Sequence, residues 1–250
     1  MKLDIHGARI FFTIPVLGGI VVTETVVNMA IISALIVLLC LYLTHDMQVH
    51  ARTKRQLIAE WIVKKVNVLV GDTMGKRFAD GDYPALIATI MFLSVLCSLS
   101  SMVGMYPATS DVSMLLGWSA VVFVLITYTK LRTNGLGRYL LSFFKPVPFF
   151  APMNMFSEVA TPIAMAFRHF GNIASGSVIT ALLYTSLAVL NNKIFGLLPG
   201  VIGQALGQIP ILQVGIPAIF SIYFDIFSGI LQAFIFCMLT MMYIAQAAEE

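Results

Sequence analysis

Long apolar runs dominate the chain, and five of them are long enough to cross a membrane. A helix needs about 20 apolar residues to span a hydrocarbon core of ~30 Å. The five runs cover about residues 26–44, 86–106, 113–131, 152–190 and 216–245. Polar and charged residues gather in the stretches between them. The pattern predicts an all-α membrane protein whose 250 residues form a single polytopic membrane domain, 1–250.

The fourth run is too long for a straight crossing. At about 1.5 Å per helical residue it exceeds the thickness of a bilayer, so the helix must tilt steeply or bend. Pro162 and Gly171 are candidate bend points. The Gly- and Pro-broken sequence FGLLPGVIGQALGQIP follows, and we interpret it as interfacial or as a helix extension. The last two helices are therefore expected to form a long tilted hairpin.

The connection between the first two runs has a helical period of its own. In RQLIAEWIVKKVNVLVGD the apolar residues that recur at helical spacing are Ile58, Trp61, Ile62, Val66, Leu69 and Val70. An amphipathic helix lying on the membrane surface fits this pattern best. Docking of the same helix to a soluble partner is the alternative.

Positively charged residues predict the orientation of the chain, because cytoplasmic connections carry more Lys and Arg. The four successive connections hold seven, none, four and one of these residues. If all five runs span, both rich connections lie on the same side. The N-terminal segment, 1–25, is then extracytoplasmic and the C-terminus is cytoplasmic.

Composition agrees with a membrane protein and excludes several chemistries. Hydrophobic residues make up 59% and charged residues 11% of the chain, against roughly 25% charged in soluble domains. The net charge of +3 says little about partners, and no feature indicates nucleic acid. Cys40, Cys97 and Cys237 lie far apart in apolar runs without metal-binding spacing. No HExxH, GxSxG or Walker lysine motif is present, so we expect no enzyme chemistry, cofactor or metal.

A single arginine, Arg168, lies inside the fourth run. A charge at the centre of a bilayer costs about 2.5–3.5 kcal/mol on insertion scales. Residues at helical spacing from Arg168 form a small and polar stripe on one face: Ser157, Thr161, Ala164, Asn172 and Ser175. The stripe favours a position of Arg168 against protein or water instead of lipid. The alternatives are a structural pair with an internal acid, or snorkelling to an interface.

A second polar stripe lies on the fifth run. It consists of Ser221, Asp225, Ser228 and Gln232, spaced four, three and four residues apart. Asp225 is nearer the outer surface than Gln232, and on the fourth run Ser175 and Ser177 lie outward of Arg168. Two facing helices would then line a polar path from the outside to the arginine. An interhelical hydrogen-bond cluster without conduction is the alternative.

Three further polar residues have two interpretations each. Asp111 precedes the third run, where it caps a helix or lies at an aqueous entrance. Glu158 lies near the cytoplasmic end of the fourth run, as an interface charge or as part of an inner exit. His169 points about a third of a turn from the arginine stripe, and packing or hydrogen bonding fits it better than proton carriage.

Three stretches together carry a family resemblance. The first, PMNMFSEVATPIAMAFRHFGNIASG, resembles the PxNxxxExxxPxxxxxRLFGNxxxG signature of ATP synthase subunit a. The segment DIFSGILQAFIFCMLTMMYIA is similar to the last helix of that family, and PATSDVSM to its element before a membrane helix. The similarity extends over most of residues 20–247, with the three motifs in the family's order.

The resemblance implies a rotary ion-channel subunit and assigns roles to residues. It places the essential arginine at Arg168. The other implied ion-pathway positions are Asn172, Gln232, Asp111 and Glu158. Two positions that often ionise in the family are Ser177 and Asp225 here, and His169 replaces the usual leucine.

The implied partners are the carboxylate-bearing c-ring subunits, the peripheral stalk b subunits, the rest of the ATP synthase and the lipid bilayer. The subunit would be non-catalytic and multi-pass in a bacterial plasma (inner) membrane. It would offer two half-channels for H⁺ or Na⁺, with the arginine between them.

Other functional classes predict different features. A secondary antiporter also places charges at mid-membrane, but its paired broken helices or internal repeat are not seen in this sequence. A purely structural membrane subunit would not need Arg168. An intramembrane enzyme would need a nucleophile with its base, or a metal constellation, and the sequence has neither pattern.

Overall fold

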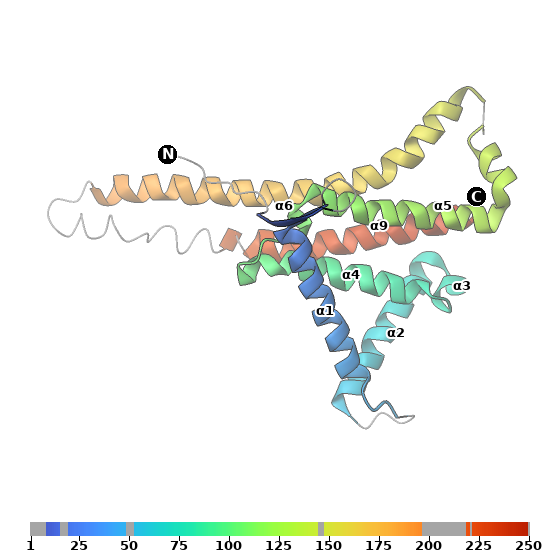
Figure 1. Cartoon of the computed structure of the whole chain (residues 1–250), viewed down its shortest axis with the longest axis horizontal. Coiled ribbons are helices and arrows are strands. Elements are labelled where there is room, and N and C mark those ends of the chain that lie inside the picture. Colours follow the sequence, from blue (N-terminus) through green and yellow to red (C-terminus); the bar gives the residue numbers. More distant parts are fainter. Residues whose placement is uncertain are drawn as a thin grey trace.

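The computed structural model describes residues 9–15, 20–48, 53–144, 148–196, 219–220 and 222–249 (Figure 1). Within these residues, five helices are long and apolar enough to cross a membrane. They comprise α1 (Glu24–Thr44), α4 (Tyr83–Leu99), α5 (Val112–Ser142), α6 (Ala151–Gly196) and α9 (Gly229–Glu249). The predicted all-α membrane fold with five spans is confirmed. The expected interfacial stretch between the last two spans lies mostly outside the described residues.

Short elements extend or join the long helices. A 3₁₀ turn, η1 (Ser100–Val103), continues α4, and η2 (Ala108–Ser110) precedes α5. A third 3₁₀ turn, η3 (Pro148–Phe150), leads into α6, and the π-helix η4 (Ile222–Ser228) leads into α9. Gly104, at φ 81°, follows η1, which explains why the second span ends before the predicted residue 106.

The third and fourth spans are both longer than the apolar runs that predict them. α5 continues past residue 131 to Ser142, with one break at Gly135, where φ is 73°. α6 has 46 residues and contains Pro162, which cannot donate an intrahelical hydrogen bond. Figure 1 shows the first part of α6 running at an angle to the rest, as the long fourth run led us to expect.

A bundle of α4, α5, α6 and α9 forms the centre of the molecule, and these helices run roughly side by side in Figure 1. Buried apolar side chains at the centre include Ile87, Val122, Met165, Phe236, Met241 and Ile244. Helix α2 (Lys54–Met74) adds Val66 and Val70 to the same core. One face of the predicted amphipathic helix therefore packs on the bundle. Its placement on a membrane surface stays a prediction.

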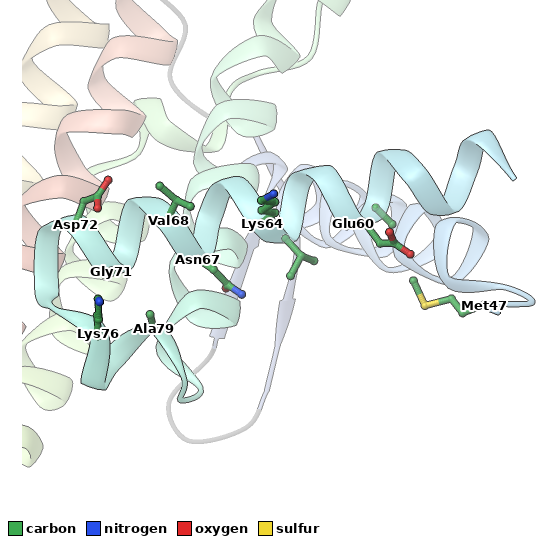
Figure 2. A pocket seen from close by; sticks show the side chains of 11 residues that line it. Met47, Glu60, Lys64, Asn67, Val68, Gly71, Asp72, Lys76 and Ala79 are labelled. Atoms are coloured by element: carbon green, nitrogen blue, oxygen red, sulfur yellow. The ribbon is translucent and has the colours of Figure 1, made fainter. Parts of the chain in front are cut away.

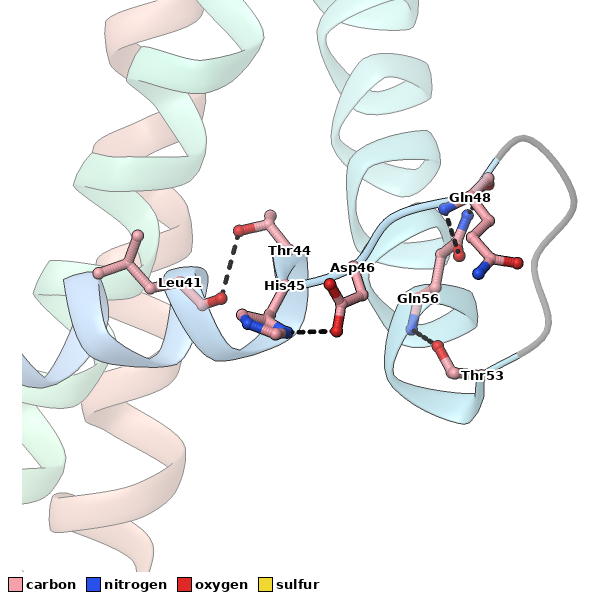
Figure 3. A network of polar contacts seen from close by, with 7 residues as sticks. All are labelled: Leu41, Thr44, His45, Asp46, Gln48, Thr53 and Gln56. Carbon is pink, nitrogen blue, oxygen red and sulfur yellow. Dashed lines mark hydrogen bonds and ion pairs between the residues drawn. The ribbon is translucent and has the colours of Figure 1, made fainter.

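The turn from α1 to α2 is held by polar contacts (Figure 3). Gln56 donates from Nε2 to the Gln48 carbonyl at 2.6 Å, and its Oε1 accepts from the Gln48 amide at 3.2 Å. Thr53 caps α2 by accepting from the Gln56 amide at 3.4 Å. α2 ends at Gly75, whose φ of 93° turns the chain into α3 (Lys76–Ala79).

A two-stranded hairpin precedes α1, and the sequence interpretation had not predicted it. β1 (Ile10–Ile14) pairs antiparallel with β2 (Ile20–Thr23). Both strands are rich in β-branched and aromatic residues, which favour extended backbone. The hairpin joins α1 directly, because the Glu24 amide donates to the Arg9 carbonyl at 2.8 Å.

Candidate functional site

Arg168 lies on a face of α6 that the rest of the described chain leaves largely open. Its side chain is exposed, as are those of Ser157, Ala164 and Ser175 from the same stripe. Among the side chains that the structure describes, none forms an ion pair or a hydrogen bond with Arg168. The guanidinium is thus available to a group outside this part of the chain.

One helical turn further along, Asn172 joins α6 to the last helix. Ser228 donates from Oγ to Asn172 Oδ1 at 3.0 Å, and Asn172 donates from Nδ2 to Gln232 Oε1 at 3.4 Å. Gln232 is only 4% exposed, so these contacts are internal to the bundle. The structure therefore brings the two predicted polar stripes together at this point.

The segment before Gln232 is a π-helix, not the α-helix assumed in the spacing of the second stripe. η4 contains Asp225 and Ser228, and Ser221 lies outside the described residues. Hydrogen bonds from residue i to i+5 change which residues share a face, so the four-three-four spacing does not hold through η4. The placement of the Asp225 side chain also lies outside what the structure describes. π-Helical turns of this kind are frequent at functional sites.

A cavity of about 460 Å³ opens beside Asn172. Its polar lining comes from Ser98, Ser101, Tyr106, Ser110, Asn172 and Ser177. The hydroxyl of Ser177 donates to the Ala174 carbonyl at 2.8 Å, within its own helix. By the predicted orientation this is the outer cavity, and it reaches from the η1–η2 region to Asn172.

Asp111 caps α5 next to the outer cavity without lining it. Its Oδ1 accepts from the Ser113 amide at 2.9 Å, and its Oδ2 accepts from the Thr25 hydroxyl at 2.9 Å. Asn28 of α1 donates to the Tyr106 carbonyl at 2.9 Å. Burial is the main cause that raises the pKa of Tyr106, and the negative charges of Asp111 and Glu24 raise it further. The geometry shows Asp111 as a helix cap, and its role at an aqueous entrance stays a prediction.

A second cavity, of about 510 Å³, lies on the other side of Arg168 along α6. Its polar lining comes from Lys130, Ser142, Asn154, Ser157, Glu158, Thr161, Tyr243 and Gln246. Glu158 Oε1 lies 3.5 Å from Lys130 Nζ, and Glu158 Oε2 accepts from the Tyr139 hydroxyl at 3.3 Å. By the predicted orientation this is the inner cavity.

His169 points into the bundle, away from Arg168. It is fully buried and packs edge-on against Trp118 and Phe236, with ring centroids 6.5 and 5.9 Å away. Neither ring nitrogen has a hydrogen-bond partner among the described residues. Of the two interpretations favoured for His169, the structure shows packing.

Three polar residues that the sequence interpretation missed contact predicted site residues or the lining of the outer cavity. Thr25 and Asn28 of α1 contact Asp111 and Tyr106, respectively. Lys130 contacts Glu158, whereas the sequence interpretation had used Lys130 only to predict the orientation in the membrane. The signal was present in part, because Thr25 and Asn28 stand three residues apart on one helix face. Their partners are distant in sequence, so local spacing does not reveal the contacts.

A third hollow, of about 620 Å³, runs along α2 and lies apart from Arg168 (Figure 2). Side chains of both charges line it: Glu60, Lys64, Asp72 and Lys76. The described residues contain no group of three or more His, Cys, Asp or Glu side chains that could hold a metal ion.

Comparisons with known proteins agree on one family. A family model described as "ATP synthase A chain" matches residues 26–245. "ATP synthase subunit a" of Acidothermus cellulolyticus is 30% identical over 233 residues, which cover 90% of this chain and 76% of the relative. The protein of the same name from Bacillus subtilis is 27% identical over 252 residues, 96% of either chain. "ATP synthase subunit a, sodium ion specific" of Propionigenium modestum is 32% identical over 136 residues, 54% of this chain and 38% of the relative.

Proposed function

The chain belongs to the ATP synthase A chain family, and on that premise we propose that it carries the coupling ion through two half-channels separated by Arg168. The family and the five apolar helices make it a multi-pass membrane subunit of the ATP synthase. Its partner at Arg168 would be the ring of c subunits. The peripheral stalk b subunits and the bilayer would hold it in place, with the N-terminus outside and the C-terminus in the cytoplasm.

One observation carries the proposal: an open arginine lies between two polar cavities on the same helix. Thr161 lines the inner cavity and Asn172 the outer one. These two positions are about 16 Å apart along α6 at 1.5 Å per residue, with Arg168 between them. Neither cavity has Arg168 in its lining, and its exposed side chain is free to meet a rotor that passes in front of α6.

The chemistry follows from the properties of guanidinium. A guanidinium group is a fixed positive charge and cannot itself relay a proton. Arg168 attracts the carboxylate of a passing c subunit and favours the ionised form of that carboxylate. The carboxylate therefore releases its ion into one cavity as it approaches and takes up another ion from the other cavity as it leaves. An ion cannot leak straight past Arg168, because the positive charge repels it.

We assign the remaining predicted residues to one side or the other. Asn172 and Gln232 line or support the inner end of the outer half-channel, and Ser177 lies along it. Asp225 is proposed as the carboxylate of the outer half-channel, a role supported by its place in the π-helical segment before Gln232. Asp111 contributes by capping α5 beside the entrance, and Glu158 borders the inner half-channel.

The decisive experiment replaces Arg168 in the assembled complex. Arg168→Ala should abolish ATP-driven ion pumping in reconstituted vesicles while the complex still assembles. Arg132→Ala is the matched control, because Arg132 is also exposed and makes no ion pair or hydrogen bond in the described part of the chain. The control should pump normally. Pumping at the wild-type rate by the Arg168→Ala complex would reject the proposal and favour a purely structural subunit.

The same vesicles identify the ion. The Propionigenium modestum relative is named as sodium ion specific, so both H⁺ and Na⁺ are tested. Uptake that needs Na⁺ and persists with a protonophore indicates Na⁺ coupling. Uptake that a protonophore abolishes, and that does not need Na⁺, indicates H⁺ coupling.

A further inference from the structure

Within the inner cavity, Lys130 of α5 faces Glu158 of α6. Both residues line the cavity, and the Lys130 Nζ to Glu158 Oε1 distance is 3.5 Å. Their side chains are only 16% and 12% exposed. We propose that Lys130 is a fixed counter-ion that occupies Glu158, so that Glu158 tunes the charge of the inner cavity and does not bind the coupling ion. This inference rests on the proposed function of the inner cavity.

Each oxygen of the Glu158 carboxylate has a polar neighbour, although Oε1 is buried and its contact with Lys130 is an ion pair without a hydrogen bond. Lys130 lies against Oε1, and the hydroxyl of Tyr139 donates to Oε2 at 3.3 Å. Tyr139 follows the break of α5 at Gly135, so two parts of α5 on either side of the break hold the same carboxylate. An ion that enters the cavity therefore meets a carboxylate that already has a cation and a hydrogen-bond donor.

Among the residues that the structure describes, the rest of the cavity lining carries no formal charge. The other lining side chains are apolar, as in Ile126 and Phe143, or polar and uncharged, as in Asn154, Thr161 and Gln246. The lining is thus neutral overall while Lys130 and Glu158 are paired. Without Lys130 it carries one negative charge, and without Glu158 it carries one positive charge.

Each of these charged states would disturb ion passage in its own way. A poorly solvated carboxylate without a counter-ion binds a proton or a metal cation tightly, because either one removes the cost of the bare charge. The ion would then be held in the cavity and leave slowly. Without Glu158, the ammonium of Lys130 would lose this carboxylate and would repel cations from the cavity more strongly. Pairing is screened little by salt at this distance and burial, so it persists at physiological ionic strength.

The test is a double-mutant cycle on ATP-driven pumping by the reconstituted complex, in which ions enter through the inner cavity. Lys130→Gln should lower both the maximal rate and the half-saturating concentration of the coupling ion on the inner side. Glu158→Gln should lower the rate and raise the half-saturating concentration. The half-saturating concentration is expected to change about tenfold in each variant. This is the lower end of the change that an opposite charge at this distance causes in the ion affinity of a carboxylate. The double variant Lys130→Gln/Glu158→Gln should return both values to within about twofold of wild type.

The outcomes separate a counter-ion from a relay. If Glu158 relays the ion, the double variant lacks the relay and stays as slow as Glu158→Gln, which overturns the proposal. Damage to folding would lower the rate without moving the half-saturating concentrations in opposite directions, and this result also overturns it. If Lys130→Gln fails to assemble, the double variant is assessed alone, since it should assemble and pump, and a complex that does not pump contradicts the inference.

Arg168→Ala in the same preparation separates this inference from the proposed function. Normal pumping by Arg168→Ala rejects the function as a whole. Loss of pumping in Arg168→Ala, together with a double variant that is not restored, rejects only the role of Lys130.

Discussion

Helices α9 and α4 meet at Gly229, where there is no room for a side chain. A Cβ atom added to Gly229 would lie 3.0 Å from Ser98 Cβ and 3.7 Å from Ser98 Oγ. Non-bonded carbon atoms settle at about 3.5–4.0 Å. The substitution Gly229→Ala therefore requires Ser98, or the helix that carries it, to give way by a few tenths of an ångström. Both residues also line the outer cavity, so the shift would reach that site.

The expected cost follows from two opposing effects. Overpacking a tight contact destabilises a protein by about 1–3 kcal/mol. Alanine favours a helix over glycine by about 1 kcal/mol, which offsets part of this cost. Gly117→Ala in α5 is the matched control, because outside its own helical turn no described atom lies within 4 Å of the added Cβ there. Both variants gain the helix propensity of alanine, so the difference between them reports the overpacking alone. The free energy of unfolding should therefore be about 1–3 kcal/mol lower for Gly229→Ala than for Gly117→Ala.

The assay is equilibrium unfolding of the purified full-length chain in mild detergent, titrated with a denaturing detergent. Ser98→Gly removes the atom that Gly229→Ala would meet, so the double variant should recover about 1–2 kcal/mol relative to the sum of the single variants. The reasoning is refuted if the two alanine variants unfold at the same free energy, or if the cycle with Ser98→Gly shows no coupling.

Two further substitutions test the contacts of α6. Asn172→Ala leaves the buried Gln232 side chain without its hydrogen-bond donor, so it should lower the free energy of unfolding by about 1–3 kcal/mol. Ser177→Ala is the control. It loses only a hydrogen bond within its own helix and should change the free energy of unfolding little. Equal effects of these two variants in the same titration would contradict the interhelical role of Asn172. The second substitution is His169→Leu. The His169 ring is buried and has no hydrogen-bond partner among the described residues. An apolar side chain in its place should therefore keep or raise the melting temperature of the complex and leave ion pumping unchanged. A lower melting temperature together with lost pumping would show that the ring has a polar partner.

The parts of the molecule that follow from local rules could be predicted from the sequence. Membrane spans follow from run length, because every backbone polar group inside a bilayer must be bonded within a helix. The open face around Arg168 follows from helical spacing, since α6 is regular there. Asn172 and Gln232 were expected on facing helices, and the structure joins them directly.

The parts that depend on a change of helical period or on distant contacts could not be predicted. The π-helix of η4 is not visible as a pattern, so the α-helical spacing through Asp225 was wrong. Thr25 and Asp111 are 86 residues apart, and nothing local to either residue indicates their hydrogen bond. The pairing of Lys130 with Glu158 likewise depends on how α5 and α6 pack, and charge counting used Lys130 only for topology.

The three faces of α6 at its middle explain why Arg168 is left open while its neighbours are engaged. His169 packs inward and Asn172 is bonded to α9, so the helix is held on two sides by contacts within the chain. If an acidic side chain of this chain were permanently paired with Arg168, the guanidinium would be held as firmly as His169 and Asn172 are. A carboxylate from a moving partner could then not displace that acidic side chain without leaving a buried charge unpaired. An open guanidinium in lipid costs about 2.5–3.5 kcal/mol, which a passing carboxylate recovers each time it arrives. On the proposed function, the exposure of Arg168 is therefore what lets each carboxylate bind in turn and leave again.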